Sequence, residues 1–152
     1  MKHAPEYIET MEKLEELIRQ VPKYSNWTFT TLCDWFSFFW NRGTIVFSID
    51  QEGVAHGVCV VKLFSKLEQF LEPFVHEPGG AFCMIELMSA DGAQTLGFLH
   101  DELVDRWGSR ELMLWDRGER TEKGTPRMYR WKEFEKLARR ITYGSRRITT
   151  TA

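Results

Sequence analysis

The stretch IELMSADGAQTLGFLHDELVDRWG, residues 85–108, contains the change of pattern that decides the fold. Its first residues continue an almost wholly apolar run over 81–88, which is typical of a strand covered on both faces. After a loop of small residues, apolar side chains recur at helical spacing up to Trp107, and Gly108 is a suitable helix end. Another apolar run, 111–115, follows. We therefore predict a β-α-β unit, whose two strands are normally parallel.

Upstream of this unit, the pattern predicts two helices and a hairpin. Apolar residues share one helical face over 5–21 and again over 28–40, where most of the many aromatic rings are expected in the core. Two β-branched runs, 44–50 and 54–64, flank a polar turn that ends in Gly53, which indicates an antiparallel hairpin. A hairpin beside a β-α-β unit predicts a mixed sheet.

Shorter elements complete the chain. Residues 65–74 predict a short helix opened by a Ser-x-x-Glu capping box. Residues 126–131 alternate like a strand, and residues 132–141 return to helical spacing. We expect an α+β fold with a mixed sheet in a single domain, residues 1–144, followed by a polar tail over 145–152.

Composition and length limit the class of protein. With 152 residues, 43% of them hydrophobic, the chain fits one ordinary globular domain. No apolar run approaches the roughly 20 residues that a membrane-spanning helix needs, so we expect a soluble, cytoplasmic protein without a membrane span. Cys33, Cys59 and Cys83 lie far apart among apolar neighbours, without metal-binding spacing. We expect reduced, buried thiols, no metal site and no bound cofactor.

Charge is distributed unevenly along the chain. Residues 1–116 contain 9 Lys+Arg and 18 Asp+Glu, whereas residues 117–152 contain 11 Lys+Arg and 4 Asp+Glu. The C-terminal quarter therefore carries +7 and the body −9. A basic segment of this kind can bind phosphate, nucleic acid or an acidic carrier protein. The interpretation we prefer is a solvated basic end that balances the acidic body.

The order of the predicted elements is similar to that of acyltransferases of the GNAT superfamily. Local motifs resemble one branch of it, the toxin-activating lysine acyltransferases. PKYSNW, residues 22–27, resembles the Pro-x-His-x-Asn-Trp segment of that family, and GVAH, residues 53–56, is similar to its Pro-Val-Ala-Tyr strand. IELMSADG, residues 85–92, resembles Ile-Asp-Trp-Ile-Ala-Pro-Phe-Gly, and residues 126–142 are similar to the late strand and helix. The resemblance implies a GNAT-like fold that transfers a fatty acyl group from acyl carrier protein to a lysine.

Two candidate catalytic residues follow from this resemblance. Tyr24 stands where the family has its catalytic histidine, and Glu86 stands where it has its catalytic aspartate. Glutamate can keep the role of the carboxylate. Tyrosine, with an ordinary pKa of about 10, is a poor base at neutral pH but can protonate a leaving thiolate.

Acyl transfer to an amine requires a group that removes the ammonium proton, and Glu86 is the first candidate. Its apolar neighbours would desolvate the carboxylate and raise its pKa toward that of a useful base. The alternative is a carboxylate at a strand end that pairs with an arginine or caps the backbone, and both interpretations stay open. His56 is a candidate second base, although we prefer a hydrogen-bonded core histidine.

The loop before the predicted helix bears on the acyl donor. Of the residues that would form a donor loop, only Gly92 and Ala93 are similar to the usual CoA-binding pattern. An Asp-x-x-Gln cap from Asp91 to Gln94 would place negative charge at the helix N-terminus and repel a pyrophosphate. The loop therefore favours acyl carrier protein over CoA as donor, and it fits equally well a fold that has lost catalysis. The candidate donor-loop residues are Ser89, Asp91, Gly92, Ala93 and Gln94, and the candidate contacts to an acidic carrier are Arg117, Arg120, Lys123, Arg127 and Arg130.

Two functions of different classes therefore remain. The first is an acyltransferase-like protein that moves an acyl group from a thioester, on acyl carrier protein or CoA, to an amine such as a lysine. The second is a catalytically inactive GNAT-like protein that serves as an assembly or interaction module, of the kind that a bacteriophage would use. A homo-oligomer is compatible with either function.

Overall fold

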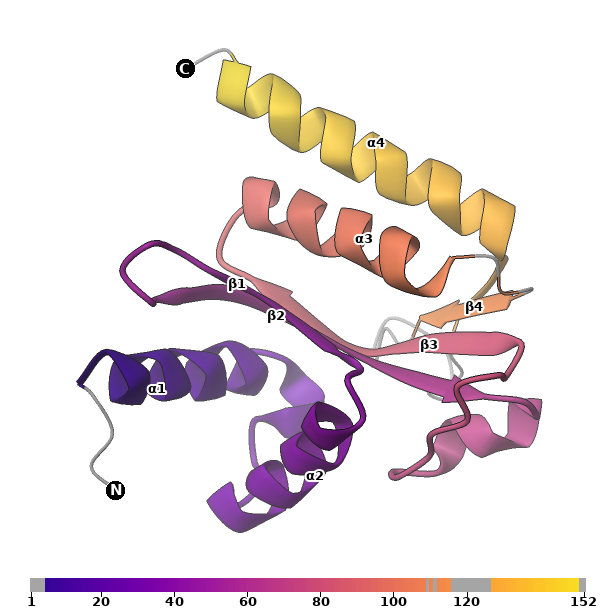
Figure 1. The fold of residues 1–152 in the computed structure, drawn as a ribbon, viewed down its shortest axis with the longest axis horizontal. Helices are drawn as coiled ribbons and strands as arrows, with labels where there is room; N and C mark the ends of the chain where they lie inside the picture. Colours follow the sequence, from indigo (N-terminus) through magenta and orange to yellow (C-terminus); the bar gives the residue numbers. More distant parts are fainter. Residues whose placement is uncertain (1–4, 109, 111, 116–126, 151–152) are drawn as a thin grey trace.

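The computed structural model describes residues 5–108, 110, 112–115 and 127–150. They form an α+β fold in which helices cover both faces of a five-stranded mixed sheet of order β1-β2-β3-β4-β5 (Figure 1). The elements are α1 (Pro5–Arg19), η1 (Pro22–Tyr24), α2 (Phe29–Asn41), β1 (Ile45–Ile49), β2 (Ala55–Phe64), η2 (Leu67–Leu71), β3 (Phe82–Ala90), α3 (Ala93–Trp107), β4 (Leu112–Trp115), β5 (Arg127–Arg130) and α4 (Trp131–Thr150), where η marks a 3-10 helix.

Both predicted N-terminal helices are present, but α1 ends at Arg19 rather than at residue 21, and α2 ends at Asn41 rather than at residue 40. Pro22 follows α1 and opens η1, because proline cannot continue the helix but suits a first position. The side chain of Thr28 caps α2 by accepting a hydrogen bond from the backbone N–H of Thr31 at 3.2 Å. Gly43 follows α2 with a φ of 74°, a conformation that glycine adopts without a steric penalty.

The predicted hairpin and β-α-β unit are both present. Strands β1, β2 and β3 are antiparallel neighbours, whereas β4 lies parallel to β3, with Phe82 opposite Leu112 and Ile85 opposite Trp115. β5 returns antiparallel to β4. Helix α4 begins at Trp131 and continues to Thr150, well beyond the stretch 132–141 that the spacing predicts.

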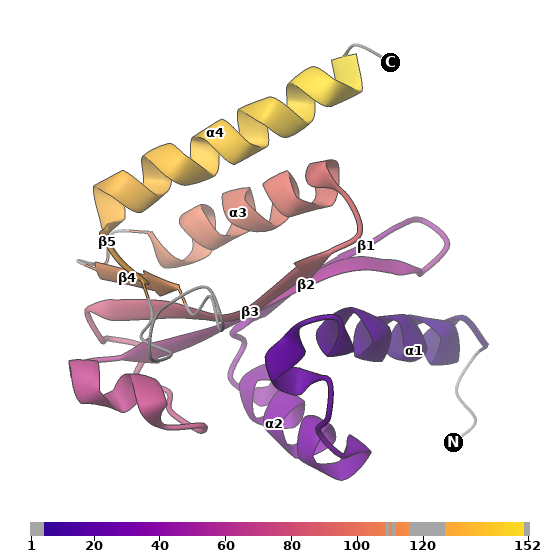
Figure 2. The same ribbon diagram turned by 180° about the vertical axis from the view of Figure 1, so that it is seen from behind.

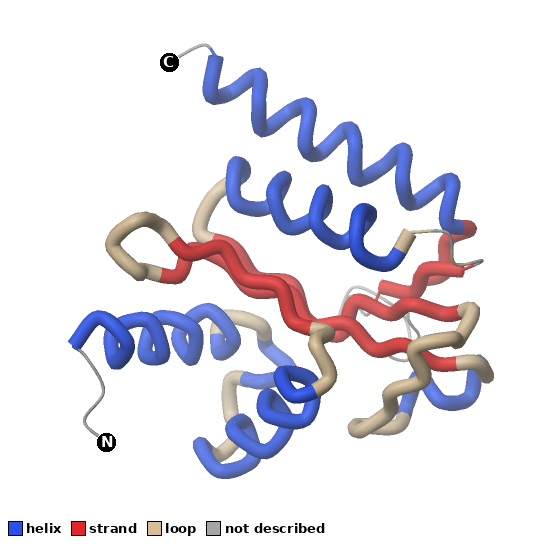
Figure 3. The backbone as a smooth tube through the Cα atoms, viewed as in Figure 1, coloured by secondary structure: helices blue, strands red, loops and turns tan. Residues whose placement is uncertain are grey.

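Two main hydrophobic clusters lie on opposite faces of the sheet. α1 and α2 cover one face, and α3 with α4 covers the other, as the views from front and behind show (Figure 2; Figure 3). Leu17, Trp35 and Phe39 anchor the first cluster, while Leu99 and Phe134 anchor the second. A small third cluster lies under η2 and consists of Phe64, Val75 and Met84, with Phe70 and Phe82 packed against it.

The short helix after β2 forms, but its predicted cap is wrong. The side chain of Gln69, rather than that of Glu68, accepts from the backbone N–H of Lys66 at 2.8 Å and of Ser65 at 3.2 Å. The hydroxyl of Ser65 instead donates to the carboxylate of Glu77, which also accepts from Gln69 at 2.8 Å. A more distant carboxylate therefore competes successfully for the serine that the local pattern assigned to the cap.

Candidate functional site

An irregularity in β3 determines where Glu86 points. Val60 of β2 lies opposite Leu87 and Val61 lies opposite Ile85, so Glu86 is the extra residue of a β-bulge. Such a bulge breaks the strict alternation of side chains and can re-aim one of them. Leu87 packs in the cluster under α1 and α2, and the side chain of Glu86 reaches η1 on the same face. Consecutive side chains therefore share one face of the strand at this position.

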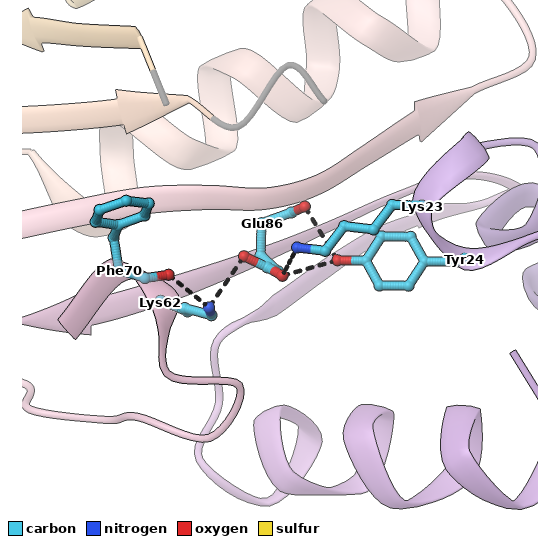
Figure 4. A network of polar contacts seen from close by, with 5 residues as sticks. All are labelled: Lys23, Tyr24, Lys62, Phe70 and Glu86. Atoms are coloured by element: carbon cyan, nitrogen blue, oxygen red, sulfur yellow. Dashed lines mark hydrogen bonds and ion pairs between the residues drawn. The ribbon is translucent and has the colours of Figure 1, made fainter. Parts of the chain in front are cut away.

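The carboxylate of Glu86 lies at the centre of a polar network (Figure 4). The side-chain amine of Lys23 donates to Oε1 at 2.6 Å, and the hydroxyl of Tyr24 donates to the same oxygen at 2.9 Å. The amine of Lys62 forms an ion pair with Oε2 at 3.2 Å and donates to the backbone carbonyl of Phe70, also at 3.2 Å. Oε2 has no directed hydrogen bond among the described residues, so its contact with Lys62 is mainly coulombic.

The network is unusual because two of its charged side chains are buried. The side chains of Glu86 and Lys62 are 3% and 2% exposed. A carboxylate or ammonium in such a place is tolerated when it is paired, because the desolvation of an isolated charge costs several kcal/mol. Lys23 differs, since its side chain is 41% exposed and reaches the carboxylate from the solvent side.

Tyr24 is held in place from several sides. It ends the one-turn helix η1 and is fully buried, and its ring lies 4.8 Å from that of Trp27 and 4.9 Å from that of Trp35. Its hydroxyl is also 3.2 Å from the backbone carbonyl of Glu86. With one proton to donate, it serves the nearer carboxylate oxygen. Tyr24 and Glu86, the two catalytic candidates, are 62 positions apart in the sequence and are brought into direct contact by the fold.

Sequence reasoning missed the two lysines. Lys62 is the one charged residue in the run VCVVKLF, residues 58–64. A charge within a strand that is otherwise buried on both faces requires a buried partner, and that signal predicts an acid on a neighbouring strand. Lys23 gives no such signal, because a lysine in a polar turn is normally solvated.

His56 lies in a second network rather than beside Glu86. Its Nδ1 is 2.6 Å from Asp91 Oδ2, and its Nε2 is 2.8 Å from Asp50 Oδ2. The preferred interpretation is therefore confirmed for the hydrogen bonds but wrong for the core position, because the side chain is 36% exposed. A ring with a carboxylate on each nitrogen is best satisfied as the imidazolium, which donates to both. We call this Asp50–His56–Asp91 arrangement the histidine clamp.

The clamp also overturns the predicted cap of α3. Asp91 points to His56, and Gly92 occupies the N-cap position without a side-chain hydrogen bond. No acidic residue lies in the first turn of α3. The argument that a capping carboxylate would repel a pyrophosphate therefore loses its structural basis. Of the other donor-loop candidates, Ser89 is buried in β3, while Ala93 and Gln94 open α3.

The candidate contacts to a carrier protein lie partly inside and partly outside the described residues. Arg117, Arg120 and Lys123 lie outside the described residues. Arg127 begins β5, and Arg130 is exposed at its end. The aromatic prediction holds in part, because Trp35 and Phe39 are in the core but Phe29 and Trp40 are more than half exposed.

The two buried thiols, Cys59 and Cys83, are not activated nucleophiles. Burial raises the pKa of Cys83 to about 12 and that of Cys59 still further, so both stay protonated near neutral pH. Cys33 is exposed, contrary to the expectation that all three are buried.

Within the ranges that the structure covers, no cluster of three or more His, Cys, Asp or Glu side chains could hold a metal ion. None of the described helices is both long and apolar enough to span a membrane.

No protein-family model, curated protein or solved structure matches this chain.

The histidine clamp predicts a specific dependence of stability on pH. Hydrogen bonds to Asp50 and Asp91 raise the pKa of His56, and the hydrogen bond from His56 lowers the pKa of Asp50. A raised histidine pKa stabilises the fold fully below the unfolded value of about 6.5, and the stabilisation is lost as pH rises through the folded pKa. His56→Gln should therefore lower the thermal midpoint by more at pH 5.5 than at pH 9.

The comparison of variant with wild type at each pH cancels the titration of other groups. His100 is such a group, since its burial lowers its pKa and gives the opposite trend. The measurement is thermal unfolding followed by circular dichroism. An equal loss at both pH values would show that the clamp is uncharged or does not contribute to stability.

Proposed function

We propose that this chain is a GNAT-like, acyltransferase-like protein that transfers an acyl group from a thioester to an amine, with Glu86 as the base. The observation that carries the proposal is the contact between Tyr24 and Glu86 at 2.9 Å. The two residues come from the segments that resemble the catalytic histidine and aspartate segments of the toxin-activating lysine acyltransferases. The element order of two helices, hairpin, β-α-β unit, strand and helix supports the same fold.

The chemistry assigns a separate task to each group. In the reaction, the carboxylate of Glu86 would hold the acceptor ammonium through Oε1 and take up its proton as the amine attacks the thioester carbonyl. Tyr24 donates to this oxygen and fixes its direction, so it is a positioning residue in the present geometry. Its hydroxyl would protonate the departing thiolate and then recover a proton from the carboxyl group of Glu86, which returns both groups to their starting states. Lys62 holds the other carboxylate oxygen from the buried side.

The donor is acyl carrier protein or an acyl-CoA. Because Asp91 is turned toward His56, the N-terminus of α3 carries no acidic cap, and a CoA donor is not disfavoured there. A carrier protein is acidic, and the exposed Arg130 on the basic C-terminal segment fits such a partner.

The test is acyl transfer to a lysine-containing peptide from acetyl-CoA, a long-chain acyl-CoA and acyl carrier protein, with release of free thiol as readout. Glu86→Gln should lower kcat/KM by about 10²–10⁴-fold, the range for loss of a general base. Tyr24→Phe should lower it less and shift the pH profile. Lys66→Ala removes an exposed lysine outside the network and is the matched control.

One observation favours the second candidate, an inactive GNAT-like interaction or assembly module. Glu86 is almost fully buried and already paired with two ammonium groups, which is also how a purely structural carboxylate is arranged. Native mass spectrometry with each donor tests this candidate. If no donor binds, and if Glu86→Gln releases thiol at the same rate as wild type, the enzyme is refuted and the interaction module becomes the favoured function.

A further inference from the structure

We infer that Lys23 is a tethered occupant of the position where an amine ligand binds Glu86, and that it closes the site to primary amines until it swings away. The inference rests on the proposed function and concerns the regulation of the same carboxylate. The ligand class is a primary ammonium, such as the side chain of a lysine in another protein.

The two lysines on Glu86 are not equivalent. Lys62 lies near the C-terminal end of β2, has a side chain that is 2% exposed, and contacts the carbonyl of Phe70 as well as Oε2. Lys23 belongs to a 3-10 helix of three residues, and its side chain is 41% exposed. Lys62 is therefore part of the interior, whereas Lys23 approaches along the route from solvent to the carboxylate.

The ammonium of Lys23 contacts the carboxylate of Glu86 in the way that the ammonium of a bound amine would. Its Nζ is 2.6 Å from Oε1, the oxygen that also accepts from the hydroxyl of Tyr24. The carboxylate is also held by the hydroxyl of Tyr24 and the ammonium of Lys62, so two of its three side-chain contacts remain when Lys23 leaves. When Lys23 leaves, water solvates its ammonium, and the ion pair with Lys62 still neutralises the buried carboxylate. Another ammonium, with three N–H donors, can then replace it.

Tethering makes Lys23 a strong competitor. A group joined to its site by a short linker acts at an effective concentration in the millimolar range or above. A free amine must compete with that concentration in the wild-type protein. When the tethered ammonium is removed, the same carboxylate should bind the amine about tenfold more tightly or better.

The experiment is an NMR titration of the protein alone, without acyl donor, with ethylammonium chloride. Lys23→Ala should show saturable shifts around Tyr24 and Glu86, with a Kd at least about tenfold below that of wild type. Tetramethylammonium chloride at equal ionic strength has no N–H donor and should give no saturable shift. Lys66→Ala should behave as wild type, and the double variant Lys23→Ala/Glu86→Gln should lose the binding.

Three outcomes would overturn the inference. They are equal affinity of wild type and Lys23→Ala, an equal response to tetramethylammonium, and binding that persists in the double variant. If circular dichroism shows that Lys23→Ala does not fold, Lys23→Gln replaces it with a neutral side chain that retains part of the stem. The titration contains no thioester, so amine binding without any acyl transfer refutes the enzyme alone, whereas transfer with unchanged amine affinity refutes the role of Lys23 alone.

Discussion

Glu86→Leu is expected to lower the free energy of unfolding by about 3–5 kcal/mol, the usual cost of removing one partner from a buried ion pair. The ammonium of Lys62 is 2% exposed and would lose its buried carboxylate. The hydroxyl of Tyr24, which is fully buried, would lose its acceptor in the same variant. The measurement is equilibrium unfolding in urea, followed by circular dichroism.

A double variant separates charge from packing in this result. Lys62→Met/Glu86→Leu replaces both charges with apolar side chains, and such replacements are often close to neutral in stability. We expect it to recover most of the loss caused by Glu86→Leu. Lys62→Met alone should cost less than Glu86→Leu, because the carboxylate keeps Lys23 and Tyr24. A double variant as unstable as Glu86→Leu would show that the loss comes from packing around residue 86 and not from the orphaned charge.

Phe134→Ala is the second change with a large expected effect, a loss of about 3–5 kcal/mol in the free energy of unfolding. The ring of Phe134 is fully buried and belongs to the cluster between the sheet and helices α3 and α4. It stacks on the ring of His100 and packs against that of Trp131. Its removal would leave a cavity where α4 docks on α3.

Lys132→Ala is the matched control for Phe134→Ala, because Lys132 is exposed on the same helix. An exposed substitution of this kind changes stability by no more than about 0.5 kcal/mol. Urea unfolding of both variants measures the difference. If the two variants lost equally little stability, α4 would not be docked through Phe134, and the basic end of the chain would be independent of the body.

The secondary structure could be predicted from the sequence because its signals are local. Apolar spacing marks α1, α2 and α3, a turn with Gly53 marks the hairpin, and an uninterrupted apolar run marks β3. The mixed sheet follows from the same pattern, because a hairpin gives antiparallel strands and a β-α-β unit gives parallel ones. The GNAT-like identity of this arrangement stays a proposal.

Part of the site could be predicted as well. The resemblance named Tyr24 and Glu86 as the two catalytic candidates, and the structure adds that their side-chain oxygen atoms are 2.9 Å apart. The local rules failed where a distant partner competed for a side chain. Asp91 is a good helix cap by its position, but it points to His56, which comes from a strand 35 positions earlier. Ser65 is likewise taken from its predicted cap by Glu77.

The sequence by itself determined the order and type of the elements, since each depends on side chains a few positions apart along the chain. Only the tertiary structure decided the bulge at Glu86, the burial of Lys62 and the approach of Lys23. These depend on which charges come together when α1, α2 and the sheet pack. A buried charge must pair with an opposite charge, and the partner can come from any part of the chain that the fold brings near. The spacing of residues along the sequence does not show which residues become neighbours in this way.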